Sequence, residues 1–258
     1  MQRLNGRSAL IWVRMLAVGL ASTLLVFIPV CSADTVKIGV LATASKAKTL
    51  AQWQPLAVVL KSAAPNRNFM IMAMTAPEME MAVASRELDF VLTNPGHYVL
   101  LTKRRGLPVP LATLAVDLNG QRTSVLGGVI FCRAGQDSIT ALSDVKGKVI
   151  AFVDTGSFEG YQIQALELAR TGVHLTQDAK QTTSGMAQDS IVEAVLAGRA
   201  DVGFLRSGVL ENLARKGLLD VKQLKVLNRQ IVPGFPVEIS TPLYPEWPFG
   251  ALHHVDEK

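Results

Sequence analysis

The stretch VIAFVDTGSFEGYQIQAL, residues 149–166, decides the fold that we predict for this chain. It opens with an apolar run, residues 149–153, which is typical of a buried strand. The turn TGS, residues 155–157, follows, and a helical pattern begins near Phe158 or Glu159. A strand that leads through a short turn into a helix presents free backbone N–H groups and the positive end of the helix dipole at one place. The stretch therefore predicts a cradle for an anion.

A second stretch has the same order of elements. Residues 88–92 form an apolar run that ends in the turn TNPG, residues 93–96, and a helical pattern starts at His97. The second stretch is also repeated later in the chain: the predicted helix 78–86 leads into residues 87–94, and the predicted helix 189–197 leads into residues 198–207. In both units an acidic residue precedes a short buried strand that ends in a polar turn. Two such units in one chain indicate two lobes, each of which offers a helix N-terminus to a shared ligand.

The alternation of strands and helices predicts an α/β fold in which each lobe is a mostly parallel sheet flanked by helices. Ligands of such sheets bind beyond the carboxyl ends of the strands. Thr43, Thr93 and Asn94 fall at these ends in the first lobe, and Ser157 and Arg206 fall there in the second. We also expect loops at residues 117–123 and 180–185, a strand at 225–228 that returns to the first lobe, and an irregular proline-rich tail.

The first 33 residues have the pattern of a secretory signal peptide. Three arginines precede the apolar run of residues 15–30, and Cys31-Ser32-Ala33 supplies small residues before a cleavage point. An uncleaved membrane anchor is the alternative, and Val30 before Cys31 argues against a lipoprotein. Either interpretation predicts a periplasmic location, with the membrane reached only through this segment.

The rest of the chain is close to neutral. Three of the 26 Lys and Arg precede Asp34, and none of the 21 Asp and Glu do, so the remainder carries a net charge of +2. This balance excludes the strongly basic class typical of nucleic-acid-binding proteins. Cys132 is then the single cysteine, and its apolar neighbours predict a buried, inert thiol.

We expect neither an enzyme nor a metal or cofactor site. The sequence around Ser157 does not have the spacing of a nucleophile elbow. The four histidines have no partners at metal-ligand spacing, so we interpret all four as structural. Glu159 fits an anion site poorly and is interpreted as a partner of the helix dipole or of a water.

Several motifs resemble the phosphonate- and phosphite-binding family of periplasmic proteins, and more specifically the variant that forms the periplasmic sensor domain of tetrathionate-sensor-like histidine kinases. The motifs cover nearly all of residues 36–252, and the last one is the most specific: DFVLTNPG (89–96), GGVIF (127–131), DVKGK (144–148), GRADVG (198–203), PGFP (233–236) and LYPEWPF (243–249). The resemblance implies a two-lobed "Venus flytrap" fold and a small anionic ligand. It also implies a membrane partner, either an ABC permease or a histidine kinase.

The resemblance also implies site residues. Transport members have a Ser-Thr-Ser-Gly-Tyr turn, of which this chain keeps Ser157, a glycine and Tyr161. Gln188 stands where the family tends to have a histidine, and Arg206-Ser207 replaces an acidic pair that meets the amino group of aminophosphonates. Because a guanidinium is a bidentate oxyanion partner, this exchange favours a ligand that is anionic throughout.

The predicted organisation is a signal peptide at residues 1–33, lobe one from 34–125 plus 225–258, and lobe two from 126–224. The expected function is a periplasmic solute-binding protein or sensor input domain that closes on a sulfur oxyanion, phosphite, phosphate or a phosphonate-like ligand. Two alternatives stay open, a transporter's substrate-binding component and a non-binding scaffold of the same fold. The predicted ligand contacts are Thr43, Thr93, Asn94, Ser157, Tyr161, Gln188 and Arg206.

Overall fold

The computed structural model describes residues 35–183, 185 and 187–257. The predicted signal peptide at residues 1–33 therefore lies outside the described residues. Among the described residues, no helix combines the length and the apolar character needed to cross a membrane.

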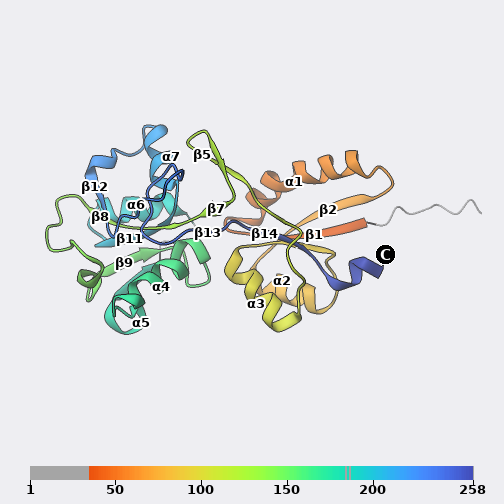
Figure 1. Ribbon diagram of the computed structural model, residues 1–258, viewed down its shortest axis with the longest axis horizontal. Coiled ribbons are helices and arrows are strands. Elements are labelled where there is room, and N and C mark those ends of the chain that lie inside the picture. The colour runs from red at the N-terminus through yellow and green to blue at the C-terminus, as the bar shows by residue number, and fades with distance from the viewer. Residues whose placement is uncertain (1–34, 184, 186, 258) are drawn as a thin grey trace, which may run out of the picture. The chain divides into compact units, whose positions relative to one another are not determined.

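The first lobe is built on a five-stranded sheet with the order β2-β1-β3-β14-β4 (Figure 1). β2, β1 and β3 are parallel, and β14 runs antiparallel to both of its neighbours. The strands are β1 Thr35–Leu41, β2 Asn68–Met74, β3 Phe90–Leu92, β4 Ala112–Thr113 and β14 Pro248–Ala251, and the helices are α1 Lys46–Ala63, α2 Ala76–Ala84 and α3 Pro95–Arg105.

The second lobe repeats this plan with the order β10-β9-β11-β8-β12, in which only β8 runs antiparallel to its neighbours. Its strands are β8 Gly128–Arg133, β9 Val149–Phe152, β10 Lys180–Thr183, β11 Val202–Arg206 and β12 Leu224–Val226, and its helices are α4 Ile163–Arg170, α5 Leu175–Asp178, α6 Gln188–Leu196 and α7 Val209–Arg215. Short 3₁₀ turns occur at Leu142–Val145, Val221–Gln223 and His253–Glu257. β3 and β11 hold the same place in their sheets, which confirms the predicted repeat.

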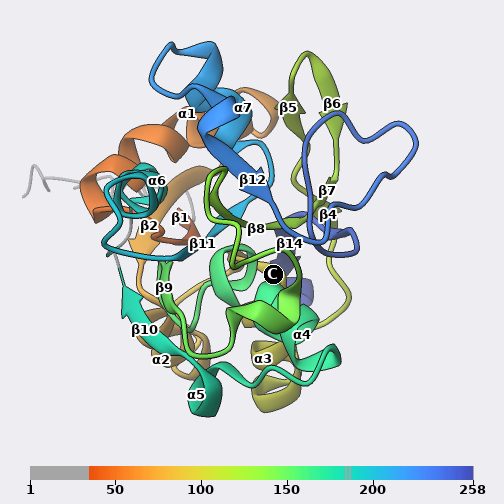
Figure 2. The same cartoon turned by 90° about the vertical axis from the view of Figure 1, so that its left-hand side faces the viewer.

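The chain passes between the lobes through a narrow two-stranded ribbon (Figures 1 and 2). β7 Val125–Leu126 pairs antiparallel with β13 Tyr244–Pro245, with Tyr244 opposite Leu126. A hairpin of β5 Val116–Leu118 and β6 Gln121–Thr123 precedes this crossing. The two connections therefore run side by side at one place.

Each sheet has its own core. Ile38, Leu88 and Leu101 are fully buried in the first lobe. In the second lobe β8 points alternate side chains to opposite faces, so Ile130 packs beneath α4 and Phe131 packs beneath α6. Burial on both faces explains why the central strands have continuous apolar runs.

Four expectations about the elements are wrong. Residues 180–183 form edge strand β10, and residues 117–123 form most of the β5–β6 hairpin. Residues 224–226 form β12, which pairs with β8 in the second sheet, so the chain does not return to the first lobe there. The tail includes strand β14 of the first sheet. Short edge strands depend on neighbours from distant sequence, which local patterns do not reveal.

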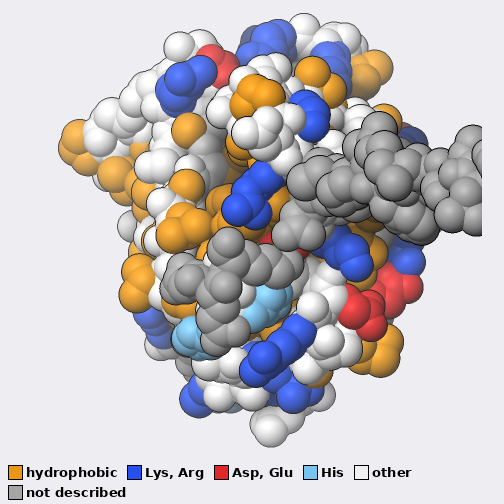
Figure 3. Space-filling model, turned by 90° about the vertical axis from the view of Figure 1, so that its right-hand side faces the viewer, with side chains coloured by type: hydrophobic (Ala, Val, Ile, Leu, Met, Phe, Trp, Pro, Cys, Tyr) orange, Lys and Arg blue, Asp and Glu red, His pale blue; other side chains and the backbone are white. Residues whose placement is uncertain are grey.

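The outer face of the first lobe is chemically mixed. In the view of Figure 3, lysine and arginine side chains are spread among hydrophobic and neutral ones and form no single basic patch on the described part of that face.

Candidate functional site

A cavity of about 810 Å³ lies between the lobes, where β1, β3, β9 and β11 end. Both lobes line it. Among the predicted contacts, Thr43 and Asn94 reach it from the first lobe, and Ser157, Gln188 and Arg206 reach it from the second. The cavity thus brings together the two turns that the sequence singles out, at the edge where ligands of parallel sheets bind.

The first-lobe turn is organised around the start of α3. The Asn94 side chain accepts a hydrogen bond from the backbone N–H of His97 (2.8 Å) and thereby caps the helix. Thr93 is fully buried and does not line the cavity. Its hydroxyl is hydrogen-bonded to His97 Nδ1 (2.8 Å). Thr93 therefore positions a neighbour rather than facing the cavity.

His97 itself lines the cavity. It is 7% exposed, its Nε2 has no hydrogen-bond partner among the described residues, and the nearest carboxylate oxygen, Glu80 Oε1, is 3.9 Å away. Burial lowers the pKa of His97, so the imidazole is held in the neutral form. The interpretation of His97 as merely structural missed this position.

The second-lobe turn leads into a π-helical turn, Phe158–Gln162, that continues as α4. The Ser157 hydroxyl accepts the backbone N–H of Gly160 (3.2 Å) and caps the helix. A Cβ on Gly160 would lie 2.8 Å from Ser157 Oγ and 3.0 Å from Val153 Cγ2, so only glycine allows this close packing.

Tyr161 does not line the cavity. Its ring packs in the second-lobe core against Phe152, with ring centroids 4.6 Å apart, and near Phe204. The expectation that Tyr161 contacts the ligand therefore lacks support in the geometry. The π-helical turn places this tyrosine on the core side of the helix.

Arg206 ends β11 and is held on several sides. Its backbone N–H donates to Gln188 Oε1 (2.8 Å), and its guanidinium is ion-paired with Glu246 and lies 3.8 Å from Glu159 Oε1. Trp247 Nε1 also donates to Glu159 Oε1 (3.3 Å). We call Arg206, Glu159, Glu246 and Trp247 the arginine cluster.

The side chains of the arginine cluster are largely buried from solvent. Glu246 is fully buried, Glu159 is 5% exposed, and the Arg206 side chain is 19% exposed. Burial raises the pKa of Glu246, although the adjacent Arg206 opposes this effect. Since one guanidinium faces two carboxylates, the cluster is richer in acid than in base, and Arg206 is not a free cation.

This acidity extends along the cavity. Glu80 and Asp154 line it together with Glu159, whereas Arg206 is the single Arg or Lys among the described residues that line it. The cavity therefore still contains acidic groups, although Arg206-Ser207 replaces the acidic pair of aminophosphonate binders.

Sequence reasoning also missed the tryptophans. Trp53 from α1 and Trp247 from the segment before β14 both line the cavity. The motif LYPEWPF contributes to the family resemblance, but the sequence does not indicate its contacts. In the structure Glu246 pairs with Arg206, and Trp247 donates to Glu159. No local pattern announces such contacts across 40 and 88 residues.

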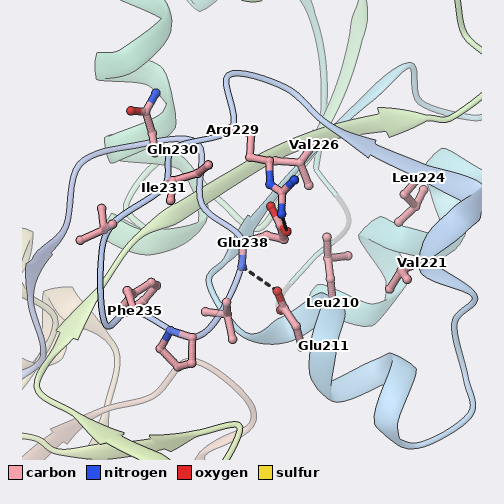
Figure 4. Close-up of a pocket in the computed structure, with 13 residues that line it drawn as sticks. Leu210, Glu211, Val221, Leu224, Val226, Arg229, Gln230, Ile231, Phe235 and Glu238 are labelled. Atoms are coloured by element: carbon pink, nitrogen blue, oxygen red, sulfur yellow. Dashed lines mark hydrogen bonds and ion pairs between the residues drawn. The ribbon is translucent and has the colours of Figure 1, made fainter.

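A second cavity, of about 660 Å³, lies within the second lobe between α7, β12 and the segment 229–238 (Figure 4). Its polar groups mostly satisfy one another: Arg229 pairs with Glu238 (2.6 Å), and Glu211 accepts the backbone N–H of Glu238 (2.7 Å). Because it is lined from one lobe and lies away from the strand ends that carry the two turns, we take the cavity between the lobes as the candidate site.

A family profile described as "ABC transporter, phosphonate, periplasmic substrate-binding protein" matches residues 38–258. The chain belongs to this binding-protein family. The family is of the solute-binding type, and the fold is the two-lobed periplasmic-binding-protein fold. The profile describes the members of the family as periplasmic.

Two curated relatives have different described roles, one as a sensor kinase and one as an import protein. The chain is 33% identical over 226 residues to the tetrathionate sensor histidine kinase TtrS of Salmonella typhimurium, covering 87% of the chain and 38% of the relative. It is 28% identical over 158 residues to the phosphate-import protein PhnD of Mycolicibacterium smegmatis, covering 53% of the chain and 49% of the relative. The chain thus spans less than half the length of each of these relatives.

Solved structures show the same fold. A Prochlorococcus marinus protein in complex with methylphosphonate has a TM-score of 0.63 at 14% identity, covering 87% of this chain and 78% of that one. A binding protein component of an ABC phosphonate transporter from Pseudomonas aeruginosa has a TM-score of 0.62 at 15% identity, covering 85% and 69%.

Proposed function

We propose that this chain is a non-enzymatic periplasmic binding domain that closes on a small oxyanion between its two lobes. The observation that carries the proposal is the cavity of about 810 Å³ that Asn94 and Ser157 both line. Each of these residues caps the start of a helix, and the two helices belong to opposite lobes. Backbone N–H groups at helix starts bind anions without needing a charged side chain. Such donors suit a cavity whose only Arg or Lys, among the described residues, is already paired.

Arg206 retains a role in this proposal. Its contact with Glu246 uses one guanidinium nitrogen, and a guanidinium carries five N–H donors. The remaining donors can reach a ligand oxygen when the lobes close, together with Thr43 and Gln188. We propose that closure occurs about the β7–β13 ribbon, because both connections cross there.

We propose that closure is read by a membrane histidine kinase, since the match to the sensor kinase covers 87% of the chain. The transport alternative rests on the family profile and on the phosphate-import relative. Adjacent kinase and response-regulator genes would favour sensing, whereas adjacent permease and ATPase genes would favour transport.

Fluorescence titration tests the binding proposal. Two of the three tryptophans, Trp53 and Trp247, line the cavity and report on its occupation. Tetrathionate, thiosulfate, sulfite, phosphite, phosphate and methylphosphonate are titrated into the purified protein, with thermal melting in parallel. At least one must change the fluorescence saturably and raise the melting temperature with concentration.

Two variants locate the site. Arg206→Gln should weaken binding about 10-fold or more, as expected when a charged hydrogen bond is lost. Arg229→Gln is the matched control, because Arg229 also pairs with a glutamate but lies outside this cavity. Each shift is measured against the variant's own ligand-free baseline. No response to any anion would refute the binding proposal and favour the scaffold alternative.

A further inference from the structure

The inference concerns Glu159, an acidic side chain at a place where the proposed ligand is an anion. Glu159 lies in the first turn of the helix that follows the predicted anion cradle, and it lines the cavity between the lobes. It is 5% exposed, so water does little to screen its charge. A carboxylate in this position must either repel the anionic ligand or accept a hydrogen bond from a hydroxyl group of the ligand.

The two oxygens of Glu159 differ in their surroundings. Oε1 accepts the indole N–H of Trp247 (3.3 Å) and lies 3.8 Å from the Arg206 guanidinium. Oε2 is buried and has no hydrogen-bond partner among the described residues. A buried acceptor that lacks a hydrogen-bond donor costs free energy, so a ligand that brings a donor to this oxygen is favoured. Because terminal carboxylate torsions are broad, a small rotation can bring either oxygen toward the cavity.

We propose that Glu159 accepts the P–OH hydrogen of a singly protonated oxyanion and thereby selects phosphonate, phosphate or phosphite over fully ionised sulfur oxyanions. This inference rests on the proposed binding function. Phosphoryl groups hold a second proton near neutral pH, whereas sulfonates and thionates have none to give. The charge-assisted O–H···O⁻ bond is among the strongest hydrogen bonds in proteins.

The same contact rejects the wrong ligand. An ionised sulfonate brings a second negative charge against Glu159 with no hydrogen between them, and like charges brought together in a buried site are strongly unfavourable. Sites built to hydrogen-bond a ligand hydroxyl reject analogues that lack it by large factors. Glu80 and Asp154 add to the acidity of the cavity and act in the same direction.

Methylphosphonate and methanesulfonate form a matched pair for the test, since they share shape and differ in the ionisable hydroxyl. We expect the purified protein to bind methylphosphonate at least about 100-fold more tightly than methanesulfonate in a calorimetric or fluorescence titration at pH 6.5. The affinity for methylphosphonate should fall between pH 6.5 and pH 8.5, as its monoanion disappears. This pH profile needs no variant.

Glu159→Gln tests the residue. The amide oxygen can still accept from Trp247, while the amide N–H₂ can donate to a sulfonate oxygen, so the preference should shrink at least about 10-fold and methanesulfonate should gain affinity. Glu211→Gln is the matched control, because Glu211 Oε2 is likewise buried without a partner but belongs to the second cavity. The control should keep the full preference.

The outcomes separate the two proposals. If methanesulfonate binds as tightly as methylphosphonate, or if Glu159→Gln leaves the preference and the pH profile unchanged, the role of Glu159 is refuted while oxyanion binding stands. If neither ligand nor any anion of the wider panel binds, the binding function falls and the selectivity with it. Tight binding of tetrathionate alone would also overturn the selectivity.

Discussion

The arginine cluster makes a quantitative prediction about stability. In Arg206→Met the guanidinium is lost while Glu246, fully buried, and Glu159, 5% exposed, keep their carboxyl groups. At 3.8 Å and an effective dielectric constant of ~20, the attraction between Arg206 and Glu159 alone is about 4 kcal/mol. Removing one member of a buried ion pair typically costs about 3–5 kcal/mol, so we expect a loss in this range at pH 7.5.

Glu246→Gln should cost less, about 1–3 kcal/mol, because Arg206 still has Glu159 beside it. The double variant, with both Arg206→Met and Glu246→Gln, should lose less free energy of unfolding than the sum of the two single losses. The difference should be at least about 1 kcal/mol, because the two residues belong to one network. Burial raises the pKa of Glu246, and loss of Arg206 removes the main opposing charge. A carboxyl whose pKa is raised in the folded state destabilises that state when it ionises, so the Arg206→Met defect should be smaller at pH 5 than at pH 7.5.

Urea unfolding followed by tryptophan fluorescence measures these free energies. Arg229→Met is the control, because Arg229 and Glu238 are 63% and 34% exposed at their side chains, and such pairs contribute about 1 kcal/mol or less. Additive single effects within about 0.5 kcal/mol, together with no pH dependence of the Arg206→Met defect, would contradict the coupled cluster.

Three further predictions concern packing and titration. Gly203→Ala places a Cβ 2.4 Å from the ring of fully buried Phe131, so overpacking should cost about 1–3 kcal/mol in urea unfolding; an unchanged midpoint would contradict it. Because burial lowers the pKa of His97 from its ordinary 6.5, the unfolded state takes up protons first as the pH falls below that value, and stability falls. His97→Gln should therefore reduce the drop in melting temperature between pH 7.5 and pH 5.5, and an equal drop would refute this account. Gly96→Ala places a Cβ 2.9 Å from Phe158 across the lobes, so small-angle scattering should show a more open molecule; an unchanged radius of gyration would contradict the contact.

Much of the fold follows from local sequence. The apolar run 149–153 predicts β9 closely, because central strands of parallel sheets are buried on both faces and appear in the sequence as continuous apolar segments. Helix α1 begins at Lys46, and Pro55 lies well inside it. Strands β10 and β14 were missed, since an edge strand and a closing strand take their identity from the neighbours they pair with.

The two turns were also within reach of the sequence. Asn94 and Ser157 are short polar residues between a buried strand and a helix, and both cap their helices beside one cavity. A strand, a turn and a helix start are local features, so their chemistry can be read from consecutive residues.

The sequence by itself therefore determined the two-lobed plan and the presence of a polar turn in each lobe. Only the tertiary structure decided what those turns face. It brought Glu246 and Trp247, from the last crossing of the chain, against Arg206 and Glu159, and it moved Tyr161 into the core. The physical reason is that the charge of a buried site depends on groups within a few ångströms in space, and here those groups are 40 and 88 residues apart in the chain.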